Sequence, residues 1–251
     1  MNTQKLLQSL DLSSFTAFDF ETTGLDPIND RIIEIAAIRF ENGEIVDRFV
    51  SLVNPGRNIP AIISDITGIS NIMVSKAPNE EKIIDEFLNF LDDIPLVAHN
   101  IHFDEKFLSQ LCLRHGKKEK NFIKYDTLQL ARSLLFDQPV FNLSALSDYY
   151  GLSSEGAHRA ENDTENTGQI FLELINEIAG YPLELISKVT SLIQGTDIPN
   201  IQLYVNLANT LIKQGDLKKG MIEQKNIPQC QTNIYSHNGK RDIQSISADD
   251  V

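Results

Sequence analysis

Short hydrophobic runs in the first part of the chain have the length and composition of β-strands. Four of them are rich in β-branched and aromatic residues, and they cover residues 13–20, 31–40, 44–53 and 94–99. Asn-Gly at 42–43, a dipeptide typical of tight hairpin turns, separates the second and third runs. The pattern therefore predicts a three-stranded antiparallel meander and a further strand. A short additional strand is expected near residues 122–127.

From about residue 80 the apolar residues recur every three or four positions, which is the spacing of amphipathic helices. The segments with this spacing are 79–91, 103–115, 128–135, 143–150, 161–179, 183–193 and 200–214. Strands followed by alternating strands and helices predict an α/β domain, in which helices flank a mixed sheet. We expect this domain at residues 1–178, a C-terminal helical extension at 179–219 and a flexible tail at 220–251.

The composition is that of a globular protein, with 41% hydrophobic residues among 251. No apolar run reaches the roughly 18 residues of a membrane span, and the N-terminus lacks the pattern of a signal peptide, so we expect a soluble, cytoplasmic chain without a membrane partner. Two isolated cysteines, Cys112 and Cys230, predict neither a disulfide framework nor a thiolate metal site. The net charge of −13 argues against broad phosphate contact, although bound divalent cations would reverse the field locally.

Two carboxylates interrupt the first predicted strand. Asp19 and Glu21 lie two positions apart in the segment FDFETTG, and alternate residues of a strand share one face about 7 Å apart. Like charges this close raise each other's proton affinity and destabilise the strand unless a cation lies between them. The pair therefore predicts a metal site with oxygen and nitrogen ligands.

Two further acids stand at the start of apolar helical stripes. Asp104 is followed at helical spacing by Phe107, Leu108 and Leu111, so its carboxylate is expected to face inward. Asp163 heads a similar stripe in the helix that ends the domain. A helix N-cap for Asp104 and a favourable interaction with the helix dipole for Asp163 are the structural alternatives. Two inward acids on separate helices are harder to explain by these structural roles alone.

A histidine lies five positions before the second of these acids. His158 precedes Asp163, and the same spacing to an Asp recurs for His99 and for His237. His237 lies in the polar tail and His99 at a strand end, whereas His158 leads from a glycine-containing loop into the helix with the inward acid. The position favours His158 as a functional residue, with a merely structural or solvated histidine as the alternative.

Three motifs, DFETTG, AHNIHFDEKFL and HRAEND, occur in this order on the elements described above. Together they resemble the DnaQ-like 3′–5′ exonucleases with the DEDDh motif set, over about residues 14–178. Bacterial polymerase proofreading subunits and the exonuclease domains of DinG-type helicases are the most similar members. The resemblance implies an RNase H-like fold, a general base at His158 and two divalent cations, Mg²⁺ or Mn²⁺. The implied metal ligands are Asp19, Glu21, Asp104 and Asp163.

The resemblance also implies which residues lie near the terminal nucleotide. These are Phe20, Thr23, Gly24, His99, Asn100 and Phe103. We expect release of nucleoside monophosphates from DNA 3′ ends, mainly single-stranded, in proofreading or repair, with a polymerase or helicase as partner. The alternatives are a 3′ exoribonuclease, a non-catalytic nucleic-acid-binding adaptor of the same fold, and a phosphohydrolase of mononucleotides. An adaptor is expected to have lost a motif position, and all five are present.

Overall fold

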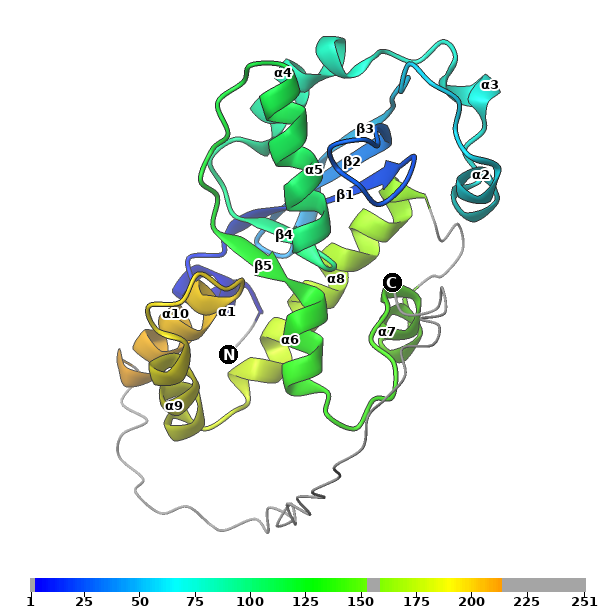
Figure 1. Ribbon diagram of the computed structural model, residues 1–251. Helices are drawn as coiled ribbons and strands as arrows, with labels where there is room; N and C mark the ends of the chain where they lie inside the picture. Colours follow the sequence, from blue (N-terminus) through cyan, green and yellow to red (C-terminus); the bar gives the residue numbers. More distant parts are fainter. Residues whose placement is uncertain (1–2, 153–158, 214–251) are drawn as a thin grey trace, which may run out of the picture. The chain divides into compact units, whose positions relative to one another are not determined.

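Five strands form one mixed sheet, in the spatial order β3-β2-β1-β4-β5 (Figure 1). The computed structural model describes residues 3–152 and 159–213. The strands are β1 Ser14–Thr22, β2 Ile32–Glu41, β3 Glu44–Leu52, β4 Leu96–Ala98 and β5 Lys124–Asp126. The strands β1, β2 and β3 are antiparallel neighbours, whereas β4 runs parallel to both β1 and β5. The predicted meander and the short fifth strand are confirmed, and β1 is the central strand.

The hairpin between β2 and β3 has the turn that its sequence predicts. Asn42 and Gly43 both have positive φ angles, 52° and 91°. Two consecutive positive φ angles match the right-handed twist of the flanking strands, and Asn and Gly tolerate them best. The turn thereby fixes the register of β2 and β3.

Helices cover both faces of the sheet. Within the described residues they are α1 Thr3–Ser9, α2 Ala61–Thr67, α3 Asn71–Val74, α4 Glu80–Leu91, α5 Ile101–Arg114, α6 Thr127–Leu134, α7 Leu143–Tyr149, α8 Ala160–Ala179, α9 Leu183–Ile193 and α10 Ile201–Lys213. The seven helices predicted from apolar spacing, α4 to α10, are confirmed. The helices α1, α2 and α3, each of seven residues or fewer, were not predicted. Segments this short give a weak helical period, although α7, also of seven residues, was recognised.

The sheet separates two hydrophobic cores. On one face α4 and α5 cover Phe18 and Phe20 of β1, and the ring centroid of Phe20 lies 5.6 Å from that of Phe87. On the other face α8 lies against β1 and β2, with α6 and α7 beside it (Figure 1). Gly168 lets α8 approach the sheet closely, because a β-carbon at this position would overlap the ring of Phe40.

The helices α9 and α10 belong to the same hydrophobic core as α8. Leu203 and Leu207 of α10 are buried together with Leu7 of α1. The Asn206 side chain donates a hydrogen bond of 2.7 Å from Nδ2 to the carbonyl oxygen of Leu10. The segment that was predicted as an extension therefore shares apolar contacts with the N-terminal end of the chain.

All described residues fall within one compact unit, Met1–Asp216. The predicted tail, residues 220–251, lies outside the described residues. Among residues 3–152 and 159–213, no helix has both the length and the apolar character that a membrane span requires.

Candidate active site

Side chains alternate between the two faces of β1, and this alternation exposes two acids at its carboxyl end. Phe18 and Phe20 are buried in the core beneath α4 and α5. Asp19 and Glu21 point to the opposite face, where they are half-buried. The strand thus holds its aromatic rings in the core and two neighbouring carboxylates on the side that α8 covers.

The first turn of α8 brings a third acid to this pair. Asp163 is half-buried, and one carboxylate oxygen from each of Asp19, Glu21 and Asp163 lies within 4.8 Å of those of the other two. The three residues come from a strand and a helix that are far apart in the sequence. The structure therefore brings together three of the four predicted metal ligands as one cluster.

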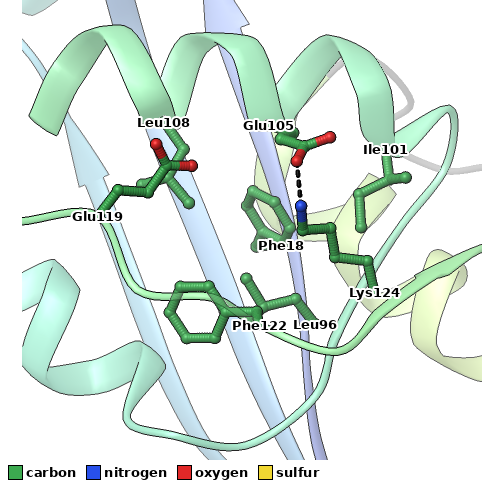
Figure 2. A pocket seen from close by; sticks show the side chains of 8 residues that line it. All are labelled: Phe18, Leu96, Ile101, Glu105, Leu108, Glu119, Phe122 and Lys124. Atoms are coloured by element: carbon green, nitrogen blue, oxygen red, sulfur yellow. Dashed lines mark hydrogen bonds and ion pairs between the residues drawn. The ribbon is translucent and has the colours of Figure 1, made fainter. Parts of the chain in front are cut away.

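The fourth predicted ligand lies next to this cluster. Asp104 is in the first turn of α5, is 2% exposed, and accepts a hydrogen bond of 3.2 Å at Oδ1 from the backbone N–H of Phe20. The next residue, Glu105, forms an ion pair with Lys124 of β5 at one side of a small pocket beneath α5 (Figure 2). The Glu105–Lys124 ion pair and the hydrogen bond from the Phe20 N–H to Asp104 fix the start of α5 against β5 and β1.

Burial and mutual repulsion change the acidity of these carboxyl groups. Burial raises the pKa of Asp19 to about 8, and the charges of Asp163 and Glu34 add to the effect. Burial also raises the pKa of Glu21 to about 9, with Asp19 as the next contributor. The pKa of Asp104 is raised by burial and then by Asp19. A crowded set of hard oxygen donors that bind protons this readily fits a divalent cation.

A further acid, which the sequence reasoning missed, organises the start of α8. Glu34 of β2 is 1% exposed and lies opposite Glu21 in the strand register. Its carboxylate accepts hydrogen bonds from Arg159 Nε at 3.1 Å and Nη2 at 2.6 Å, and from the Ala160 backbone N–H at 3.1 Å. It thus caps the first turn of α8 from a neighbouring strand. An acid within the apolar run RIIEIAAI is the signal that could have identified it.

Two of the predicted substrate residues shape the loop that follows β1. The Thr23 hydroxyl donates to Asp30 Oδ1 at 3.0 Å and accepts the Arg31 backbone N–H at 3.0 Å. Gly24 lies against the carboxylate of Asp30, where a β-carbon would not fit. Phe20, also predicted near substrate, has its ring in the core and offers only its backbone to the site.

The remaining predicted substrate residues surround the start of α5. Asn100 is exposed, has a φ of 66°, and makes no side-chain bond to the helix that it precedes. His99 Nδ1 lies 2.9 Å from the hydroxyl oxygen of Thr127, and burial lowers the pKa of His99 to about 4, so its ring is neutral at pH 7. Phe103 is half-buried, with its ring centroid 5.0 Å from that of Phe107.

His158 lies outside the described residues. The residue that follows it, Arg159, is held by Glu34 as described above. The role of His158 therefore stays a prediction, and the structure adds only that α8 begins next to the carboxylate cluster.

Comparison with known proteins identifies the class to which this fold and acidic cluster belong. The chain is a member of the exonuclease family represented by RNase T, whose model matches residues 16–171. The predicted family, the RNase H-like mixed sheet and the assignment as an exonuclease are confirmed. Members of such a family use divalent metal ions, in agreement with the cluster of Asp19, Glu21 and Asp163.

Relatives include both polymerase and helicase-linked proteins. The chain is 38% identical to the 3′-5′ exonuclease DinG of Bacillus subtilis, over 72% of this chain and 19% of that protein. It is 35% identical to the PolC-type DNA polymerase III of Caldanaerobacter subterraneus, over 79% of this chain and 14% of the polymerase. It is 34% identical to the DNA polymerase III subunit epsilon of Aquifex aeolicus, over 69% of this chain and 86% of the subunit. The chain thus spans a small part of the first two relatives and most of the third.

Solved structures show the same fold. Exonuclease X in complex with 5′ overhanging duplex DNA is 27% identical, with a TM-score of 0.53 over 68% of this chain and 95% of that chain. Escherichia coli Exonuclease I in complex with a dA16 oligonucleotide is 21% identical, with a TM-score of 0.58 over 72% of this chain and 46% of that chain. The second likeness concerns the fold alone.

Proposed function

We propose that this chain is a 3′–5′ exonuclease that releases nucleoside monophosphates from the 3′ ends of DNA during proofreading or repair. The observation that supports this proposal best is the set of three carboxylates from β1 and α8 within 4.8 Å of one another. A buried fourth acid, Asp104, lies beside them. Such a set has no favourable structural role without a cation, because each charge raises the pKa of its neighbours.

We assign Asp19, Glu21, Asp104 and Asp163 as the residues that would hold two divalent cations, Mg²⁺ or Mn²⁺. When bound, the cations lower the pKa of the attacking water and stabilise the charge on the leaving 3′ oxygen. Asp104 is aligned for this role by the Phe20 N–H, which occupies part of its hydrogen-bonding capacity. His158 then acts as the general base that takes the proton of the water.

The terminal nucleotide is expected between the loop after β1 and the start of α5. Thr23 and Gly24 hold this loop through Asp30, so they shape the site through the backbone. Asn100 and Phe103 have exposed or half-buried side chains at the other side. His99 is neutral, which suits hydrogen bonding and excludes it as the group that titrates near pH 7.

Two properties of the relatives support DNA as the substrate and a larger assembly as the working form. The relatives are named as DNA polymerases, a polymerase subunit and DinG. In two of them the matching region is a small part of a longer chain. We propose a DNA polymerase or a helicase as the partner, and single-stranded 3′ ends as the preferred substrate. The cytoplasmic location stays a prediction.

The proposal is tested with 5′-labelled single-stranded DNA, duplex DNA and RNA, each incubated with Mg²⁺ or Mn²⁺ and resolved on a gel. The expected result is a ladder that shortens from the 3′ end of single-stranded DNA and is absent for Asp163→Asn. Asp148→Asn, which changes an exposed acid on α7, is the matched control and should cleave normally.

Three other outcomes would replace the proposal. Faster cleavage of RNA would indicate an exoribonuclease, and binding of oligonucleotides without cleavage would indicate an adaptor. Hydrolysis of a mononucleotide ester without any shortening of oligonucleotides would indicate a phosphohydrolase.

A further inference from the structure

The residue that precedes α10 is bonded to the edge strand of the sheet. Asn200 is 4% exposed and has a φ of 69°. Its side chain accepts the Asp126 backbone N–H at Oδ1 and donates from Nδ2 to the Asp126 carbonyl oxygen, both at 3.0 Å. Its own backbone N–H donates to the Lys124 carbonyl oxygen at 3.1 Å. Asn200 therefore satisfies backbone groups on the open side of β5, which would otherwise be unpaired.

The strand residue that Asn200 holds has a buried carboxylate, which the reaction proposed above does not use. Asp126 is 1% exposed, and its Oδ1 accepts three backbone N–H groups, from Asn100 at 3.2 Å, Leu128 at 2.9 Å and Gln129 at 3.2 Å. Its Oδ2 is buried and has no hydrogen-bond partner among the described residues. A single oxygen therefore connects the end of β5, the start of α6 and the start of α5.

The bond to Asn100 leads to the metal site. Asn100 precedes α5 in a left-handed conformation, and its side chain makes no capping hydrogen bond to the helix. Its backbone N–H donates to the Asp126 carboxylate, which holds it in place. Asp104 lies in the first turn of the same helix. Two consecutive contacts thus connect α10 to the turn that carries a predicted metal ligand. A displacement of about 1 Å at such a position is large enough to reduce a catalytic rate about 100-fold.

We propose that Asn200 is a positioning residue for the nuclease site, which it serves by fixing Asp126 and, through it, Asn100 and the first turn of α5. The proposal rests on the function proposed above. It gives the segment after residue 179 a part in catalysis, because Asn200, which holds the end of β5, immediately precedes α10. Asn206 lies within α10 and is instead hydrogen-bonded to Gln202 of the same helix and to the carbonyl oxygen of Leu10.

The test compares Asn200→Gly with Asn206→Ala. Glycine adopts the φ of 69° without strain and deletes both side-chain bonds to Asp126, whereas Asn206→Ala deletes a bond of the same helix to Leu10. Amide hydrogen exchange is measured by mass spectrometry on peptides that contain Asn100, and kcat and KM are measured on single-stranded DNA. We expect Asn200→Gly to exchange faster at Asn100 and to lower kcat about tenfold, with KM changed less than twofold. Asn206→Ala should leave both quantities near the wild-type values.

Unchanged exchange and unchanged kcat in Asn200→Gly would overturn the proposal. Equal effects of Asn200→Gly and Asn206→Ala would overturn it as well, because the cause would then be the general attachment of α10. If Asn200→Gly does not fold, Asn200→Asp takes its place with the same measurements, since Asp tolerates positive φ and retains the acceptor for the Asp126 N–H. A wild-type chain without nuclease activity would refute the proposed function, while the exchange measurement would still test the positioning.

Discussion

Arg159 and Glu34 form a two-pronged ion pair that fixes the start of α8 on β2, with Arg159 Nη2 2.6 Å from Glu34 Oε1. Glu34 is 1% exposed, whereas the Arg159 side chain is 43% exposed. The pair differs in kind from a surface ion pair, because the loss of the arginine would leave a buried carboxylate without its cation.

The first prediction concerns this pair. Arg159→Ala should lower the free energy of unfolding by about 2 kcal/mol, since it leaves the Glu34 carboxylate buried beside other acids. Arg48→Ala, which breaks more exposed ion pairs with Glu161 and Glu165, should cost less than about 1 kcal/mol. Urea denaturation of both variants measures the difference. Equal losses would mean that Arg159 acts only as a surface charge.

The second prediction is a pH dependence of stability without divalent cations. The folded-state pKa values of about 8 for Asp19 and about 9 for Glu21 exceed the value near 4 expected for an unfolded chain. Between these values the folded protein retains protons that the unfolded chain has released, so the free energy of unfolding should fall as the pH rises from about 5 to about 9. Melting temperatures in a chelating buffer measure this fall. Asp19→Asn should flatten it, whereas a slope as steep as that of the wild type would contradict the assigned repulsion.

The third prediction concerns addition and loss of metal. Mn²⁺ at about one hundred times its dissociation constant should stabilise the folded wild type by about 2.7 kcal/mol. Asp163→Ala should abolish cleavage and most of the stabilisation by Mn²⁺. Without metal, this variant should melt at a temperature equal to or higher than that of the wild type, because it relieves repulsion within the cluster. Calorimetric melting with and without Mn²⁺ tests both statements. Normal cleavage by this variant, or by Asp19→Ala, would refute the assigned metal site.

The fourth prediction distinguishes the roles of His158, His99 and His237 in the reaction. His158→Ala should lower the rate roughly 10²–10⁴-fold and remove the acidic limb of the pH–rate profile, with metal affinity nearly unchanged. His99→Ala should retain that limb, because His99 has a pKa of about 4 and is already neutral over the relevant range. His237→Ala should have no effect. Loss of the limb in His99→Ala instead would mean that the wrong histidine was assigned as the base.

The fifth prediction concerns truncation. A chain that ends after residue 220 should cleave short oligonucleotides at the wild-type rate, since none of the predicted ligands lies beyond it. A chain that ends after residue 178 should unfold or aggregate, because it loses Leu203 and Leu207 from the core that contains Leu7. Circular dichroism and gel filtration of the two truncated chains compare them. A stable chain ending at 178 would show that α9 and α10 are dispensable for folding.

The sequence predicted the sheet and its longer helices well, because each has a strong local signal. The Asn-Gly turn predicted the hairpin, and the apolar stripe behind Asp104 predicted an inward acid that the structure places at 2% exposure. The signals are local in both cases: a dipeptide for the turn and a helical period for the stripe.

Local sequence signals did not predict the contacts that assemble the site. Glu34 carries the same signal as Asp19, an acid in an apolar strand, but its partner Arg159 is 125 residues away in the sequence. Asn200 gave no signal, because its function depends on the unpaired edge of β5 and therefore on the order of the strands. Pairings of this kind follow from the tertiary fold and cannot be read from periodicity.

The close approach of α8 to β2 at Gly168 limits how this protein can be engineered. Replacement of a helical glycine by alanine is a common route to higher thermal stability, worth about 0.4–1 kcal/mol through the unfolded chain. That route is closed at Gly168, where the added methyl group would meet the Phe40 ring. A library designed for thermostability should therefore vary positions 40 and 168 together, with a smaller side chain at 40 accompanying any side chain at 168.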